Sequence, residues 1–345
     1  LVRLTFPETI PAGKATLKVA YEAEFNQELR GLYRVEVGEN AYAFTQFEAT
    51  SARSAFPSFD EPRFKTTFDV ALTVPKTAVA AANTPAARSV GLPGELRRVQ
   101  YLTTPPLPTY LLAWAVGPFD VVEAEPLPVN EVREQTIPFR GLAVRGQGQK
   151  LQYALEHTAA FVAALEAYFG IPYPYRKLDI VAVPDFAAGA MENVGLITFR
   201  ERLLLLTDKA PESQRRAFAY VMAHELAHQW FGNLVTMPWW DDIWLNESFA
   251  TWMGNKVVEQ LRPQYRSDLS ALAYTHGAMS FDSLTSAHRI RQPVRNEHDI
   301  RNAFSPITYQ KGGAVLQMFE QWMEPERFRQ AIQLYLRKHE NGTAT

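Results

Sequence analysis

The sequence predicts an α+β protein, in which an antiparallel β domain comes first and a mixed α/β domain, rich in helix toward its end, follows. Three observations predict this class. Hydrophobic residues alternate with polar ones up to about residue 120, they recur at helical spacing after Gly148, and further helical patterns follow to the end of the chain. We place the two domains at residues 1–124 and 125–345.

The first domain is predicted from short strands with one buried face. Apolar side chains largely alternate with polar ones within residues 16–25 and again within residues 68–74. These apolar positions are Leu17, Val19, Tyr21 and Phe25 in the first run, and Phe68, Val70, Leu72 and Val74 in the second. The break Val116–Gly117–Pro118 and the polar stretch Glu123–Glu134 mark the junction with the second domain.

The second domain is expected to begin with a long amphipathic helix. Its apolar stripe is closed by Gly170 and Pro172 and is interrupted only by Thr158. The stripe consists of Leu151, Ala154, Leu155, Phe161, Val162, Leu165 and Phe169. Strands are predicted over Leu178–Val183 and Leu196–Phe199, on either side of a loop at 184–194.

Composition bounds the possible functions. The chain has 345 residues, 47% of them hydrophobic and 21% charged, with a formal net charge of -2, so nothing indicates a nucleic acid partner. No run reaches the roughly 20 apolar residues of a membrane-spanning helix. There is no cysteine, so a metal would be held by His, Asp and Glu. A cytoplasmic and a periplasmic location both fit, and the oligomeric state is not indicated.

The stretch from Ser213 to Gly232, SQRRAFAYVMAHELAHQWFG, is the most informative part of the chain. It is predicted to be a buried helix, with Pro211 in its first turn and Gly232 just past its end. His224 and His228 stand four residues apart, so both imidazoles lie on one face, where they can bind a single zinc ion. Because H-E-x-x-H fixes only three positions and occurs by chance in unrelated helices, a third ligand is needed to support the site.

Glu247, nineteen residues after His228, is the candidate for that third ligand. A helix over Trp244–Trp252 would place its carboxylate so that it can return to the first helix. Two His and one Glu leave a fourth position open for water, which is the arrangement of catalytic zinc. Asp241 and Asp242 are the alternative ligands, although capping of the helix that begins near residue 243 also explains them.

Together these motifs resemble the zinc aminopeptidases of the aminopeptidase N family, which are gluzincins. H-E-L-A-H with Glu247 at this offset is preceded by Gly189–Ala190–Met191–Glu192–Asn193, which is similar to the family signature G-x-M-E-N. Further stretches similar to the family occur in the same order: Thr45–Gln46–Phe47–Glu48, Phe59–Asp60–Glu61–Pro62 and Tyr309–Gln310–Lys311–Gly312. The resemblance implies a saddle-like β domain before a thermolysin-like catalytic domain.

Relatives in that family continue into a large C-terminal helical domain. The chain therefore resembles a bacterial-type member whose catalytic domain is truncated, and we expect it to be a fragment of a longer protein. Two positions depart from the family pattern: Val194 stands where many relatives carry Trp, and Ser248 where many carry Gly.

The expected reaction is hydrolysis of the N-terminal peptide bond, with one Zn²⁺ per chain. Glu225, next to the first metal ligand, is the expected general base toward a water that zinc polarises. The resemblance implies that Tyr309 donates a hydrogen bond to the tetrahedral oxyanion, whereas the residue pattern alone is equally compatible with a core tyrosine.

Substrates are expected to be peptides with a free N-terminus. Glu192 would bind the α-ammonium group through a charge-assisted hydrogen bond, and the resemblance implies that Glu48 shares this role. The backbone of Gly189 and Ala190 would pair with the substrate as an added strand. Three further candidates for substrate binding are Gln46 and Met191, for which ordinary packing is an equal alternative, and Asn193 of the same motif.

Four alternatives stay open on the sequence. A zinc endopeptidase would share the metal helix, and comparing N-acetylated with free peptides would distinguish it. An epoxide hydrolase with aminopeptidase activity belongs to the wider superfamily, and an epoxide assay would test it. The chain could also be an inactive binding module, or a truncated fragment that binds zinc without turnover.

Overall fold

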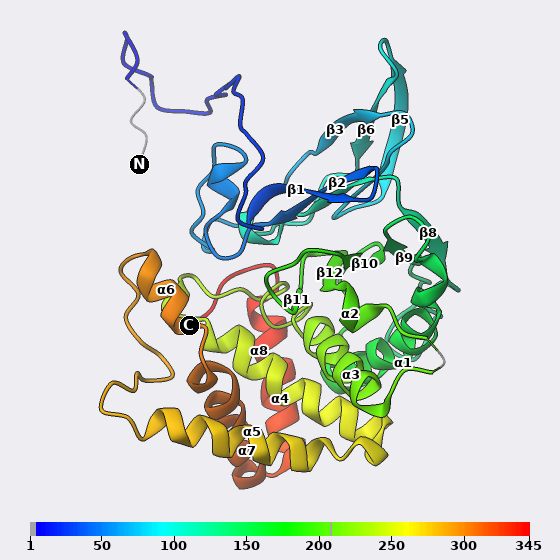
Figure 1. Ribbon diagram of the computed structural model, residues 1–345. Helices are drawn as coiled ribbons and strands as arrows, with labels where there is room; N and C mark the ends of the chain where they lie inside the picture. Colours follow the sequence, from blue (N-terminus) through cyan, green and yellow to red (C-terminus); the bar gives the residue numbers. More distant parts are fainter. Residues whose placement is uncertain (1–4, 208) are drawn as a thin grey trace.

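The computed structural model describes residues 5–207 and 209–345. Figure 1 shows a β-rich N-terminal part above a larger part that is rich in helix, which confirms the predicted α+β class. The start of the first predicted domain, residues 1–4, lies outside the described residues.

Two small antiparallel sheets build the N-terminal part. The four-stranded sheet has the order β1-β2-β7-β4, and the three-stranded sheet has the order β3-β6-β5. Their strands are β1 (Gly31–Val37), β2 (Asn40–Gln46), β3 (Ala71–Pro75), β4 (Val79–Ala82), β5 (Ala86–Leu92), β6 (Leu96–Tyr101) and β7 (Trp114–Gly117). The alternation over residues 68–74 is as predicted, because its four apolar positions are more buried than the exposed residues Asp69, Ala71 and Thr73 between them.

The strand predicted over residues 16–25 is wrong. This segment forms no strand, and Leu17, Val19 and Tyr21 are exposed. An alternating pattern shows that a segment suits one-sided burial, but a strand also needs a neighbour to satisfy its backbone hydrogen bonds. Within the described part of this region, pairing starts only at the single bridge between Asn26 and Tyr33.

The C-terminal part contains a mixed five-stranded sheet in the order β11-β12-β10-β9-β8. Its strands are β8 (Asp120–Glu123), β9 (Phe139–Ala143), β10 (Leu178–Val183), β11 (Ala190–Met191) and β12 (Leu196–Arg200). β10 lies parallel to β9 and β12, whereas β8 and β11 run antiparallel at the two edges. β8 lies before residue 125 but belongs to this sheet, so the sheet begins before the proposed domain boundary at 124. That boundary stays a proposal.

Helices pack beside and below this sheet (Figure 1). The α-helices are α1 (Gln152–Phe169), α2 (Glu201–Leu204), α3 (Glu212–Ala227), α4 (Trp244–Leu261), α5 (Ser267–Asp282), α6 (Glu297–Ala303), α7 (Gly312–Met323) and α8 (Pro325–His339). The short helices used below are η2 (Thr109–Leu111), η4 (Trp240–Asp242) and the π-type turn η6 (Ile307–Lys311). Every residue of the predicted α1 stripe is buried, and the Thr158 hydroxyl that interrupts it donates to Ala154 O at 2.7 Å.

Helix α3 ends earlier than the sequence predicts. It begins at Glu212, one residue after Pro211, and it ends at Ala227, so that Gly232 lies beyond a tight turn rather than just past the helix. The turn begins where Gln229 N bonds Leu226 O, a spacing of three residues instead of four. Gly232 has a φ of +119°, which only glycine adopts easily.

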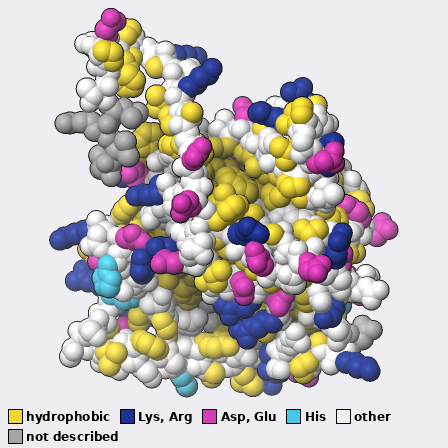
Figure 2. Space-filling model, turned by 45° about the horizontal axis from the view of Figure 1, so that its top comes forward, with side chains coloured by type: hydrophobic (Ala, Val, Ile, Leu, Met, Phe, Trp, Pro, Cys, Tyr) yellow, Lys and Arg dark blue, Asp and Glu magenta, His cyan; other side chains and the backbone are white. Residues whose placement is uncertain are grey.

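The surface is uneven in composition. Figure 2 shows hydrophobic side chains gathered in a hollow in the upper part of the molecule, with acidic and basic side chains interspersed below it. Across the described ranges, no helix has the length and hydrophobicity that crossing a membrane requires.

Close packing of α7 against α4 depends on a glycine. A Cβ placed on Gly312 would overlap the Ser248 hydroxyl and would lie 2.8 Å from the Ser248 Cβ. The Ser248 hydroxyl in turn donates to Thr308 O at 2.6 Å, so the start of α7 and η6 are fixed on the same residue of α4.

Gly312→Ala should therefore destabilise the fold by about 2 kcal/mol through overpacking. Gly277→Ala in α5 is the matched control, because a Cβ there meets nothing within 4 Å and should stabilise the helix by about 0.5–1 kcal/mol. Urea unfolding midpoints measure both changes. Equal shifts for the two variants would contradict the packing argument, and Ser248→Gly should relieve part of the Gly312→Ala loss.

Candidate metal and peptide site

The end of helix α3 presents three polar side chains in the interior between the sheet and α4. His224 and Glu225 lie in α3, which packs against α1 and α4, and His228 directly follows it; the three are 8%, 6% and 1% exposed, respectively. Burial of such groups without compensation is unfavourable, so their partners determine what the site can do.

The predicted ligand set comes together across α3 and α4. The Nε2 atoms of His224 and His228 are 3.0 Å apart, and Glu247 Oε2 is 3.3 Å from the first and 3.6 Å from the second. Ligand bonds of about 2.0–2.1 Å in tetrahedral geometry would separate neighbouring ligand atoms by about 3.3 Å. The three residues thus have the spacing of ligands around one small divalent cation.

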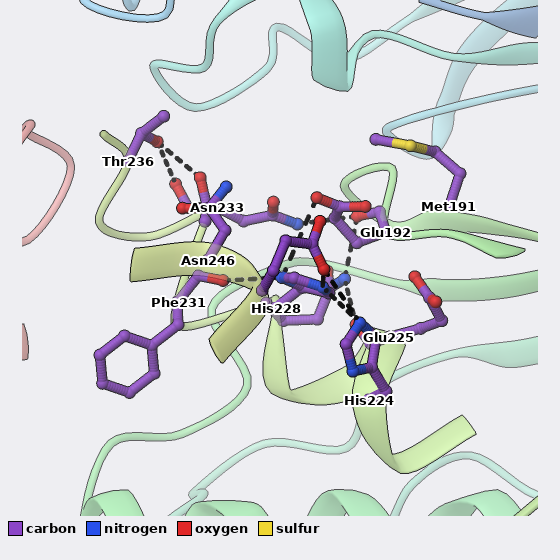
Figure 3. A network of polar contacts seen from close by, with 12 residues as sticks. Met191, Glu192, His224, Glu225, His228, Phe231, Asn233, Thr236 and Asn246 are labelled. Carbon is purple, nitrogen blue, oxygen red and sulfur yellow. Dashed lines mark hydrogen bonds and ion pairs between the residues drawn. The ribbon is translucent and has the colours of Figure 1, made fainter. Parts of the chain in front are cut away.

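The hydrogen bonds around these residues also fit a cation. His228 Nδ1 lies 3.0 Å from Phe231 O, to which it can donate its proton, so that Nε2 is left as an acceptor (Figure 3). Glu247 Oε2 has no hydrogen-bond partner within the described ranges, although it is buried. Acceptor atoms that face one another without a shared donor are stabilised by a metal ion at their centre.

A second acidic group borders the ligands. Glu192, Glu225 and His228 offer ligand atoms within 4.8 Å of one another, and Glu192 Oε1 lies 4.0 Å from His228 Nδ1 (Figure 3). Burial raises the pKa of Glu225 well above its usual range, and the carboxylates of Glu192 and Glu247 raise it further against the opposing effect of His228. Burial and Glu247 likewise raise the pKa of Glu192.

Glu48 and Tyr309 face the same cluster from two other elements. Burial, followed by Glu192 and Glu247, raises the pKa of Glu48 well above its usual range, and its Oε1 is buried without a hydrogen-bond partner among the described residues. The Tyr309 ring in η6 stacks on His224, with the ring centroids 6.1 Å apart. Burial raises the pKa of Tyr309 too, reinforced by the surrounding carboxylates, so its hydroxyl is a proton donor at neutral pH.

The motif at 189–193 forms the edge of the sheet. β11 pairs only with β12 in the sheet order, and Gly189 O accepts from Arg200 N at 2.9 Å. The opposite side of β11 is therefore the position where an extended peptide could add as a further strand. Asn193 Nδ2 donates to Thr198 Oγ1 at 3.2 Å, which fixes the turn that follows the motif.

Gln46 and Met191 meet across the two domains. Gln46 Nε2 lies 3.3 Å from Met191 Sδ, and both residues are buried. Since β2 carries Gln46 and leads into Glu48, the N-terminal domain supplies part of the wall beside the motif strand.

Comparison with known proteins identifies the family. Residues 153–345 match the peptidase family M1 domain, and residues 1–111 match the peptidase M1 N-terminal domain. The chain belongs to peptidase family M1. This confirms the resemblance to the aminopeptidase N-like enzymes that the motifs indicate.

Curated relatives of this M1 chain carry aminopeptidase names. It is similar to aminopeptidase M1-B of Oryza sativa subsp. japonica, with 39% identity over 100% of this chain and 39% of the relative. It is similar to leucyl aminopeptidase of Saccharolobus solfataricus (38% identity, 95% of this chain, 41% of the relative) and to human endoplasmic reticulum aminopeptidase 1 (36% identity, 98% and 36%). The M1 chain thus spans about two fifths of the length of these relatives.

Asp241 and Asp242, the alternative metal ligands suggested by the sequence, lie away from the cluster of His224, His228 and Glu247. Asp241 and Asp242 in η4 form ion pairs with Arg291 at 2.9 Å and 2.7 Å, and they are not part of the ligand cluster. Their expected role as caps is also wrong, because neither η4 nor α4 has a side-chain cap. Arg291, 50 and 49 positions further along the chain, donates to both carboxylates instead.

Several polar residues around the M1 site are not predicted by the sequence. Gln229 and Asn233 donate to Glu192 O at 3.0 Å and 2.8 Å, and Asn246 donates to the Tyr110 hydroxyl at 3.2 Å. The sequence marks these residues only as polar side chains that interrupt apolar runs next to the proposed metal ligands. Their partners, 37 to 136 positions away, cannot be found from spacing.

The M1 ligand set predicts proton release on metal binding. Burial opposes protonation of His228, but Glu192 and Glu247 outweigh it and raise its pKa well above the usual range, which favours the protonated imidazole when no metal is bound. A metal needs the neutral imidazole, so Zn²⁺ affinity should rise with pH up to that pKa. Calorimetric titration of Zn²⁺ into the metal-free protein, in buffers of different ionisation enthalpy, should show release of about one proton or more. A stoichiometry far from one ion per chain, or no proton release, would contradict the site.

Proposed function

We propose that this protein is a zinc-dependent aminopeptidase that removes single N-terminal residues from peptides. The observation that carries the proposal is the position of Glu192, whose carboxylate lies within one cluster with Glu225 and the metal ligand His228. Zinc, held by His224, His228 and Glu247, would polarise the scissile carbonyl and lower the pKa of a water molecule.

Glu225 is suited to move the proton of the attacking water. Its buried position beside other carboxylates raises its pKa, which favours uptake of the proton that the water loses and its return to the leaving amine. Tyr309, whose hydroxyl stays protonated, would donate a hydrogen bond to the oxygen that becomes negative in the transition state.

Glu192 and Glu48 would hold the free α-ammonium group of the substrate. The Oε1 atom of each carboxylate is buried without a hydrogen-bond partner, as judged over the described chain, so each has capacity for a cationic donor. The anchor lies so close to the metal ligands that one residue fits before the cut. An endopeptidase is disfavoured, because a continuous chain would bring an uncharged amide to these acids.

Glu225→Gln should keep the metal but lower kcat/KM by about 10³-fold, because an amide cannot accept the proton of the water. Peptide cleavage and zinc content, measured on the same sample, test this prediction. Glu212→Gln on the exposed first turn of the same helix is the matched control and should leave both values unchanged. Substantial remaining activity in the Glu225 variant would assign the base elsewhere.

Glu192→Ala should raise KM for free-amine peptides by at least tenfold, since a charge-assisted hydrogen bond contributes about 1.5–3 kcal/mol. N-acetylated peptides, which carry no ammonium group, should be poor substrates of the unaltered protein and should be little affected by the change. Glu36→Ala, on the exposed side of β1, serves as the control. An unchanged KM would remove the anchoring role of Glu192.

A further inference from the structure

The turn after α3 presents three consecutive carbonyl groups to the N-terminal domain. Gly232 O accepts a hydrogen bond from the Tyr110 hydroxyl at 3.2 Å. Asn233 O and Leu234 O accept from Lys65 Nζ at 2.9 Å and 3.0 Å. We call residues 232–234 the carbonyl turn. Donors from the N-terminal domain thus contact every carbonyl of the turn, and Thr236 Oγ1 also donates to Gly232 O at 2.7 Å and to Asn233 O at 3.3 Å.

Within the described ranges, Lys65 Nζ donates only to backbone carbonyls. Its third contact is to Gly342 O at 3.3 Å, so three backbone carbonyls match the three N–H groups of its ammonium. No ion pair of the described residues includes Lys65, and burial lowers its pKa to about 7. Burial of a lysine amine without a carboxylate partner is unfavourable unless its N–H groups are satisfied, and here three backbone carbonyls accept from it.

On its other side, the carbonyl turn contacts the residues of the proposed metal and peptide site. Asn233 N donates to His228 O at 3.0 Å, which fixes the end of the metal helix, and Asn233 Nδ2 donates to Glu192 O at 2.8 Å. Figure 3 shows Asn233 on this turn, beside Glu192 and His228. One residue therefore joins the metal ligand, the ammonium anchor and, through its carbonyl, Lys65.

Tyr110 makes a second connection. Its hydroxyl accepts from Asn246 Nδ2 at 3.2 Å, and Asn246 directly precedes the ligand Glu247. The turn backbone is also in close contact with both ligand segments, because a Cβ on Gly232 would lie 3.0 Å from Asn246 Nδ2 and 3.4 Å from His228 Nδ1. A shift of the carbonyl turn would therefore displace ligands from both α3 and α4.

We propose that Lys65 and Tyr110 are positioning residues through which the N-terminal β domain sets the geometry of the metal ligands and of Glu192. The inference rests on the proposed function, in which Glu192 binds the substrate ammonium group. It assigns to the N-terminal domain a role in catalysis beyond lining the peptide site with Glu48 and Gln46, because the carbonyl turn transmits the position of that domain to His228 and Glu192.

The test uses Lys65→Met and Tyr110→Phe in the zinc-loaded protein, since each keeps the size of the side chain and removes its donors. Two affinities are measured, for leucine hydroxamate and for its analogue without the amine. Their ratio reports how well Glu192 holds the ammonium group. A chelator competition gives the Zn²⁺ dissociation constant, and thermal unfolding gives Tm.

We expect the ratio of the two affinities to fall about tenfold, and the Zn²⁺ dissociation constant to rise about tenfold, as is typical when groups supporting a ligand are lost. Lys76→Met and Tyr101→Phe are the matched controls. Lys76 pairs with Glu95 on the surface of the same domain, and the buried Tyr101 hydroxyl has no hydrogen-bond partner in the described chain. Both controls should leave the ratio and the zinc affinity unchanged.

A lower Tm with unchanged affinity ratio and zinc affinity would overturn the inference and leave Lys65 and Tyr110 a purely structural role. If Lys65→Met does not fold, Tyr110→Phe, which removes one oxygen atom, still gives both readouts. If the unaltered protein does not distinguish the two hydroxamates, the ammonium role of Glu192 fails, and the zinc affinity of the variants still decides the positioning role.

Discussion

Buried negative charge is the constraint on which the site depends. The carboxylates of Glu192, Glu225 and Glu247 are buried beside two imidazoles, and the half-buried Glu48 faces the same cluster. Four such groups could not all be ionised there without cations, and in the metal-free protein the raised pKa values of Glu48, Glu192 and Glu225 express that conflict. A divalent metal ion and a substrate ammonium group together bring three positive charges. Binding of either one would therefore reduce the repulsion among the buried carboxylates.

The same constraint explains how the fold is divided. The proposed metal ligands lie at the end of α3 and in α4, which pack together in the C-terminal part, whereas the proposed ammonium anchors follow the edge strand β11 and strand β2 of the neighbouring domain. Residues so far apart in the chain hold a site only if the contacts between their segments are rigid. The carbonyl turn is such a contact, because it lies between α3, the segment of β11 and Glu192, and the N-terminal β domain.

Local patterns predicted much of this arrangement. The stripe of α1 and the spacing of His224 and His228 follow from helical geometry, and Glu247 follows from a second amphipathic segment. The segment around Leu17 shows the limit, because alternation cannot supply a partner strand. Lys65 shows another limit, since its acceptors lie 168, 169 and 277 positions away and are backbone atoms, which no side-chain pattern reveals.

The edge strand β11 is only two residues long, with pairing limited to Ala190 and Met191. Long exposed edges invite other β-rich chains to join them, and that is a common origin of fibrils. A two-residue edge can offer hydrogen bonds to the first few peptide groups of a flexible chain, yet it is too short to template a stack. The shortness of β11 thus limits its use as a template for other chains, while its free side still allows the proposed pairing with a substrate peptide.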